Sequence, residues 1–169
     1  PTSVFSSPMC VIDTTRATNG SATAIDNCTN VVTNITYSNA RVNGSCNDNF
    51  TINRTWTAVD SCGNSTSCIQ VITISDTTRP VITCPAARTV YSNNVCTIDT
   101  TTLNTGNATA TDNCTNLVTN IIYSNARVNC SCLNNFTINR TWTAVDSCGN
   151  GASCIQIISI FDTIDPTVT

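Results

Sequence analysis

The sequence contains no lysine, no glutamate and no histidine, and only 10% of its 169 residues are charged. Strong helix formers are therefore missing, while the abundant Thr, Val and Ile favour a pleated surface, so we predict an all-β fold. Without these three residue types, general acid-base and nucleophilic chemistry would rest on Asp or Tyr, and we expect no enzyme. Arginine is the only cationic side chain and the net charge is −3, which disfavours nucleic acid as a partner.

Long apolar runs are also missing, since no stretch approaches the roughly 18 to 20 residues that a membrane span needs. The chain begins with Pro1 and has no signal segment, so we expect a mature piece of something longer or processed. Its 12 cysteines indicate an oxidising, extracellular or cell-surface location. Zinc is disfavoured because there is no histidine and no Cys-x-x-Cys pair, so we expect disulfides.

The most informative feature that is present is an internal repeat with a period of 86 residues. Residues 49–64 recur without change as residues 135–150. Self-similarity at a fixed period indicates a modular array. We predict two tandem domains, residues 1–76 and 77–161, and a strand in residues 162–169 that belongs to, or is donated to, the next domain.

The two ends of the chain differ in a complementary way. Residues 161–169 match residues 75–83, which lead into the second repeat, whereas Pro1 aligns with Ala87, so the first repeat has no counterpart of residues 79–86. We therefore expect the protein to be its own partner in a head-to-tail array. The array is either one continuous polypeptide or a homopolymer of subunits that complement one another by strand addition.

The tryptophan segment of each repeat alternates strictly between apolar and polar residues. Such a period of two predicts a strand with one buried face, and several such strands separated by turns predict a β-sandwich. Arg54 lies on the apolar face beside Trp56. We expect its stem to pack while its guanidinium stacks on Trp56 or reaches an Asp.

Several short motifs together resemble one known family. They are residues 76–85 (Asp-Thr-Thr-Arg-Pro-Val-Ile-Thr-Cys-Pro), 111–114 (Thr-Asp-Asn-Cys), 141–146 (Thr-Trp-Thr-Ala-Val-Asp), 149–150 (Gly-Asn) and 153–156 (Ser-Cys-Ile-Gln). This pattern is similar to the hyalin-repeat class of immunoglobulin-like modules, which occur in tandem on extracellular and cell-surface proteins. The resemblance implies two tandem, disulfide-rich immunoglobulin-like β-sandwiches with an adhesive, spacer or structural role.

The same resemblance implies a disulfide scheme. It pairs Cys84 with Cys154, Cys96 with Cys114, Cys132 with Cys148, Cys10 with Cys28, and Cys46 with Cys62. Cys68 and Cys130 are left over, and we expect these two to be joined between neighbouring subunits, or Cys68 to pair with a cysteine just outside this chain. Spacing alone leaves the connectivity open.

Asparagine sequons are abundant, at about twice the number that this composition gives by chance. Asn49 and Asn53 alternate with the apolar face of their strand, so we expect them on the solvent face, accessible to covalent glycans. The alternative is that asparagine only fills a polar surface. The 12 candidate sites are Asn19, Asn27, Asn34, Asn43, Asn49, Asn53, Asn64, Asn107, Asn113, Asn129, Asn135 and Asn139.

The aspartates are the remaining groups that could carry chemistry. Asp13, Asp26, Asp60 and Asp76 recur as Asp99, Asp112, Asp146 and Asp162, with Asp165 added near the end. Calcium bound at the linker between repeats is one interpretation, because hard cations need several oxygen ligands. Ordinary turns and caps are the other, and there is no Asp-x-Asp-x-Asp loop. We expect no other cofactor.

The function that these observations favour is structural. We expect an extracellular, glycosylated fibre or surface array, joined head to tail by strand complementation. The alternative is an adhesin stalk or ligand-binding module, and a small disulfide-rich inhibitor is a third class. An adhesin would carry a divergent, aromatic-rich loop in one repeat. The repeats diverge mainly at residues 1–18 and 87–104, neither of which contains an aromatic cluster, so the fibre is favoured.

Overall fold

The computed structural model describes residues 2–5, 12–28, 31–114, 118–132 and 134–168. The chain is mostly β-strand and divides into two compact units, Pro1–Thr78 and Arg79–Thr169. The prediction of an all-β, disulfide-containing fold is confirmed. Within the described ranges, neither of the short helices has the length and hydropathy that crossing a bilayer requires.

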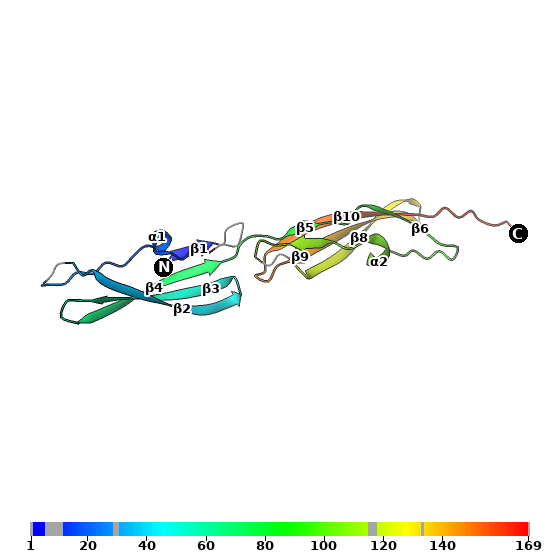
Figure 1. Ribbon diagram of the computed structural model, residues 1–169. Coiled ribbons are helices and arrows are strands. Elements are labelled where there is room, and N and C mark those ends of the chain that lie inside the picture. The colour runs from blue at the N-terminus through cyan, green and yellow to red at the C-terminus, as the bar shows by residue number, and fades with distance from the viewer. Residues whose placement is uncertain (1, 6–11, 29–30, 115–117, 133, 169) are drawn as a thin grey trace. The chain divides into compact units, whose positions relative to one another are not determined.

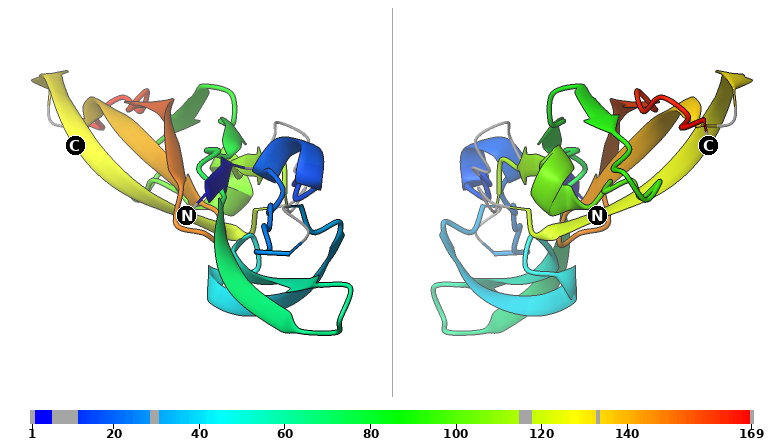
Figure 2. Two further views of the ribbon diagram at one scale, coloured as in Figure 1. Left: turned by 90° about the vertical axis from the view of Figure 1, so that its left-hand side faces the viewer. Right: turned by 90° about the vertical axis from the view of Figure 1, so that its right-hand side faces the viewer.

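Unit 1 is built on one four-stranded sheet with the order β1-β4-β3-β2. The strands are β1 (Thr2–Phe5), β2 (Asn34–Cys46), β3 (Asn49–Val59) and β4 (Ser65–Ser75). β1 runs parallel to β4, and the other pairs are antiparallel. The short helix α1 (Arg16–Asn19) lies over one face of this sheet, as both Figure 1 and Figure 2 show.

Unit 2 repeats this sheet with the order β6-β10-β9-β8. Its elements are β6 (Arg88–Tyr91), α2 (Thr102–Thr105), β8 (Asn120–Cys132), β9 (Asn135–Val145) and β10 (Gly151–Phe161). The register is that of unit 1 displaced by 86 residues, so that Trp142 faces Tyr123 on β8 as Trp56 faces Tyr37 on β2. The same sequence blocks therefore make the same pairings twice.

A second, two-stranded sheet distinguishes unit 2. It consists of β5 (Val81–Thr83) and β7 (Thr109–Thr111), which pair in antiparallel orientation. In the part of unit 1 that the structure describes, the residues equivalent to β7 make only an isolated bridge, between Ala24 and Val32. Among the described residues of unit 1, no strand takes the place that β5 has in unit 2.

The hairpin turns are fixed by aspartate side chains. The Asp60 carboxylate accepts hydrogen bonds from the backbone N–H groups of Cys62 and Asn64, both at 2.8 Å, and from the Asn64 side chain. Gly63 has a φ of +89°, which a residue with a side chain adopts only with strain. The same contacts recur around Asp146 and Gly149. The turn residues of the repeat therefore set the strand register directly.

A buried arginine lies at the centre of each unit. Arg54 is 1% exposed, and its guanidinium carbon lies 4.6 Å from the ring centroid of Tyr37 and 5.8 Å from that of Trp56. The prediction that it stacks on Trp56 is confirmed. The alternative partner, an aspartate, is replaced by two oxygens: the guanidinium donates to Asn39 Oδ1 at 2.9 Å and to the Thr14 carbonyl at 2.5 Å.

The equivalent arginine of unit 2 has a more complete set of partners. Arg140 donates to Asn125 Oδ1, to the Thr100 carbonyl and to Thr105 Oγ1, at 2.6 to 2.8 Å. Unit 1 has Asn19 in place of Thr105, and there both Arg54 Nη1 and Asn19 Oδ1 are buried without a hydrogen-bond partner. Unmet buried polar groups destabilise a fold, so the core of unit 1 is the less well satisfied of the two.

Arg140→Met tests this arrangement. The substitution keeps an apolar stem but leaves three acceptors without their donor, and we expect it to lower the unfolding free energy of unit 2 by about 3 to 5 kcal/mol. Chemical denaturation followed by tryptophan fluorescence measures the change. Arg88→Met, at an exposed position of the same unit, is the control and should change stability by less than about 0.5 kcal/mol. Equal effects of the two substitutions would contradict the assignment.

Candidate functional site

The second sheet of unit 2 covers a small apolar cluster. Ala110 on β7 is 2% exposed, Val118 is 4% exposed and Ala144 on β9 is fully buried. Ile82 on β5 packs against these residues and pairs with Ala110. The backbone N–H of Val118 donates to the carbonyl of Ala110. β5 therefore completes a local core.

Unit 1 has the same residues without the covering strand. Ala24 accepts a hydrogen bond from the N–H of Val32, as Ala110 does from Val118, but Ala24, Val32 and Ala58 are only half-buried. Ile25 is 87% exposed. Two adjoining hollows, of about 190 and 270 Å³, lie along these residues and share Ala24 and Ala58. We call this surface the acceptor groove: it lies where β5 and its contacts lie in unit 2.

A disulfide of unit 2 corresponds to a free cysteine in unit 1. Cys84, directly after β5, is bonded to Cys154 on β10, which is the pair that the resemblance implies. The equivalent of Cys154 is Cys68 on β4, which is an exposed free thiol at the edge of the acceptor groove. Among the described residues of unit 1, Cys68 therefore has no disulfide partner.

Three of the other implied cysteine pairs do not agree with the structure, and the fourth, Cys132–Cys148, lies partly outside the described side chains. Cys28, Cys62 and Cys96 are exposed free thiols, so the pairs Cys10–Cys28, Cys46–Cys62 and Cys96–Cys114 were wrong. The physical reason is that each of the three lies in a solvent-exposed turn or loop, where spacing does not select a partner. Cys46, Cys114 and Cys148 are disulfide-bonded. Cys10 and the side chains of Cys130 and Cys132 lie outside the described residues.

The C-terminal segment is hydrogen-bonded to unit 2 at Asp162, and Val168 near its end is exposed. The Asp162 N–H donates to Asn135 Oδ1 at 2.7 Å, as the Asp76 N–H does to Asn49 Oδ1. Hydrogen bonds from the Ile164 N–H and from the Ser92 hydroxyl lower the pKa of the Asp162 carboxyl. Val168, the equivalent of Ile82, is 98% exposed. An apolar residue of strand type is thus presented to solvent.

The remaining aspartates serve turns in each unit. The Thr18 and Thr15 hydrogen bonds lower the pKa of Asp13, the Asn64 side chain lowers that of Asp60, and Thr101 lowers that of Asp99. These are local contacts within loops, which agrees with the turn interpretation.

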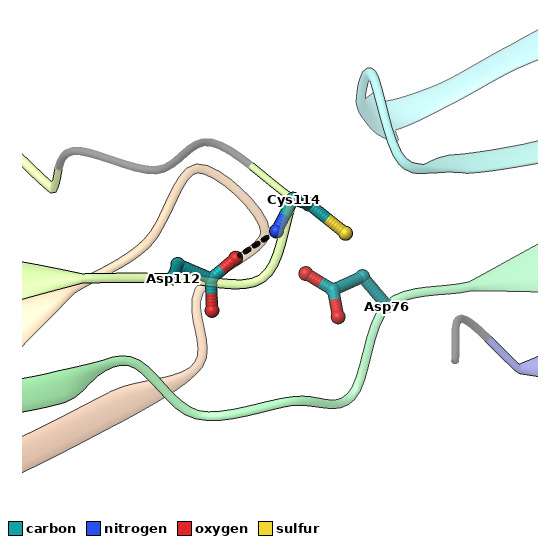
Figure 3. Close-up of side chains that lie close together, drawn as sticks. All are labelled: Asp76, Asp112 and Cys114. Atoms are coloured by element: carbon teal, nitrogen blue, oxygen red, sulfur yellow. Dashed lines mark hydrogen bonds between the residues drawn. The ribbon is translucent and has the colours of Figure 1, made fainter. Parts of the chain in front are cut away.

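Asp112 is the exception among the aspartates of unit 2. Its Oδ2 accepts from the Cys114 N–H at 2.9 Å, the dashed line in Figure 3. Its Oδ1 is buried without a hydrogen-bond partner. The sulfur of Cys114 is in a disulfide and so offers no thiolate ligand. Calcium at the linker stays a prediction.

The sequons differ in accessibility. On β3 the buried residues are Arg54 and Trp56, so Asn49 and Asn53 lie on the opposite face of the strand, as expected. Asn49, Asn53, Asn135 and Asn139 are half-buried, because they lie on the central strand of each sheet. Asn19 is buried and its amide donates to the carbonyls of Asp13 and Thr15. The side chain of Asn129 lies outside the described residues, and Asn113 is half-buried. The exposed sequons are Asn27, Asn34, Asn43, Asn64 and Asn107.

Sequence reasoning missed the residues that line the acceptor groove. Ala24 and Ala58 carry no chemical signal in the sequence. The available signal was the repeat itself, since their equivalents Ala110 and Ala144 are core residues of a unit that has the extra strand. No protein-family model matches the chain, and no curated protein matches it.

The disulfide of unit 2 can be tested against its unpaired counterpart. Cys84→Ser removes a cross-link that spans 70 residues and should lower the unfolding free energy of unit 2 by about 4 kcal/mol in the loop-entropy model. Cys68→Ser, at the exposed free thiol, should leave the denaturation midpoint of unit 1 unchanged. Denaturation under oxidising conditions measures both. A large loss for Cys68→Ser would mean that this thiol has a structural partner.

Proposed function

We propose that the protein is a structural subunit of an extracellular, glycosylated fibre or surface array. Its C-terminal segment, residues 162–169, enters the acceptor groove of unit 1 in a second copy of the chain. The observation that carries the proposal is the comparison of the two units. The equivalent apolar residues are covered by β5 in unit 2 and open in unit 1, and the C-terminal segment matches the segment that contains β5.

The register of the proposed contact follows from the internal one. Val81 pairs with Thr111 and Ile82 with Ala110 in unit 2. Displaced by 86 residues, Thr167 would pair with Ile25 and Val168 with Ala24. Backbone hydrogen bonds would supply affinity, and the alternate side chains would supply specificity, as in other cases of strand addition.

Burial gives the contact a driving force. Ile82 is half-buried against Ala110, Val118 and Ala144, so Val168 would leave water in the same way against Ala24, Val32 and Ala58. Fully burying a valine side chain is worth about 1.5 to 3 kcal/mol. Thr167 would point outward, because Val81, its equivalent, is 69% exposed.

The finer description of the fold is part of this proposal. Each unit is proposed as an immunoglobulin-like β-sandwich of the hyalin-repeat class, with the four-stranded sheet as one layer and the β5–β7 sheet as the second. The acceptor groove would be the place of the second layer in unit 1. The disulfide between Cys84 and Cys154 supports this layering, because it joins the two sheets.

Val168→Asp tests the assembly. A carboxylate placed against Ala24 and Ala58 would have no partner, so we expect association of subunits to weaken about 100-fold or more. Sedimentation velocity and negative-stain electron microscopy of the full chain measure it. Thr167→Asp is the matched control, since the adjacent residue faces outward, and it should assemble like the wild type.

Two outcomes would overturn the proposal. One is a wild-type chain that stays monomeric at all concentrations. The other is a Val168→Asp variant that assembles as the Thr167→Asp control does. A denaturation midpoint equal to that of the wild type shows that each variant is folded.

Glycans are proposed at the exposed sequons. A surface with so little charge needs another source of repulsion between neighbours, and hydrated glycans provide it. In material secreted by a glycosylating host, peptide mapping after glycosidase treatment should find sugar on Asn34, Asn43 and Asn107 and none on buried Asn19. Full occupancy of Asn19, or bare peptide at all the exposed sites, would contradict this prediction.

A further inference from the structure

Unit 2 contains a cleft of about 590 Å³ that the head-to-tail contact does not use. It lies beside β6, the loop that follows β6, and α2. Its lining includes Tyr91, Asn93, Thr97, Asp99 and Asn104. We propose that this cleft binds a neutral carbohydrate, with Tyr91 as the stacking platform. This function would be additional to the structural one and independent of assembly.

Tyr91 lines the cleft, and a second exposed aromatic ring, Phe161, lies next to it. Tyr91 is 61% exposed and Phe161 is 42% exposed, and their ring centroids are 6.4 Å apart with an interplanar angle of 37°. The parallel pairing of β6 with β10 places them in register. Large aromatic side chains on a free surface are unfavourable unless they contact something, so two adjacent ones indicate a binding surface.

The polar groups of the cleft are held in place by contacts of their own. Asn93 Oδ1 accepts from the backbone N–H groups of Val95 and Thr97, at 3.1 and 2.8 Å, which leaves the amide of Asn93 as a donor. Asn104 donates to the Asp99 carbonyl at 2.8 Å, which leaves its side-chain oxygen as an acceptor. Groups already fixed lose little entropy when they bind a ligand.

Asp99 contributes the one carboxylate of the lining. Its Oδ1 accepts from the Thr101 N–H at 2.9 Å, and a carboxylate has further acceptor sites beyond this bond. The hydrogen bonds from Thr101 lower the pKa of Asp99, so this carboxyl group is ionised at neutral pH. An ionised carboxylate makes strong hydrogen bonds to hydroxyl donors.

The charged residues in the lining of the cleft indicate which class of ligand it binds. Among the described residues of the lining there is no arginine, so a phosphate or carboxylate ligand would find no cation. A single carboxylate supplies too few oxygen ligands for a hard metal ion. A neutral sugar fits both conditions, because its C–H face packs on an aromatic ring while its hydroxyls donate to Asp99 and accept from Asn93.

The cleft is where the two repeats differ most in sequence. By alignment, the positions of Tyr91, Asn93, Asn104 and Phe161 are held in the first repeat by Phe5, Ser7, Thr18 and Ser75. The first repeat therefore lacks both amides and the second ring. A site confined to the second repeat is expected of a binding function and is not needed for a shared fold.

Affinity electrophoresis of the full chain tests the proposal. The probes are four soluble neutral polysaccharides in native gels: hydroxyethylcellulose, xylan, galactomannan and dextran. We expect at least one to retard the wild-type chain. Tyr91→Ala should weaken that retardation about tenfold, whereas Tyr91→Phe should largely retain it, because the ring face is kept. Leu103→Ala, at a 96% exposed residue of α2 outside the lining, is the matched control.

The outcomes separate this site from the assembly contact. Asn104→Ala should also weaken retardation, and Val168→Asp should leave it unchanged. Phe161→Ala provides a second ring variant if Tyr91→Ala unfolds, as judged by its denaturation midpoint. Wild-type mobility unchanged by all four probes would overturn the proposal. Folded Tyr91→Ala or Phe161→Ala protein that is retarded as strongly as the wild type would overturn it too.

Discussion

The buried arginine is the interaction on which each unit depends. Arg54 and Arg140 place a charged group at the centre of a small β fold. Among the described residues, its partners are carbonyl, amide and hydroxyl oxygens and aromatic faces. Because a guanidinium has five donors in a fixed plane, its partners must come from several segments. It therefore ties the helical loop on one face to the sheet.

A glutamine beside each tryptophan also has its polar groups hydrogen-bonded inside the fold. Gln156 is 1% exposed, accepts from the Trp142 indole N–H and donates to the carbonyls of Thr105 and Ala86. Gln70 accepts from Trp56 and donates to the carbonyl of Asn19. Ala86 lies shortly after β5, the strand that covers the apolar cluster of unit 2. In unit 2, the chain segment that contains β5 therefore both covers the apolar cluster and supplies a hydrogen-bond acceptor to the buried Gln156.

Much of the fold could be predicted from the sequence, and the reason is physical. Strict alternation around Trp56 and the Asp-x-x-Gly turns act over a few residues, so strands and hairpins follow directly from them. Because the sequence repeats, each of these local predictions applies to both units. Cysteine pairing could not be predicted in this way, since Cys28 and Cys62 have the same spacing as bonded counterparts yet are free. Pairing depends on distances that only the folded chain sets.

The sequence by itself determined the all-β class, the twofold repetition and the match between the C-terminal segment and the segment that contains β5. Only the tertiary structure decided what these features mean. It placed Ala24 and Ala58 in an open groove and brought Tyr91 beside Phe161 across 70 residues. Such surfaces form from side chains on separate strands, and local sequence patterns carry no information about which distant residues a sheet makes adjacent.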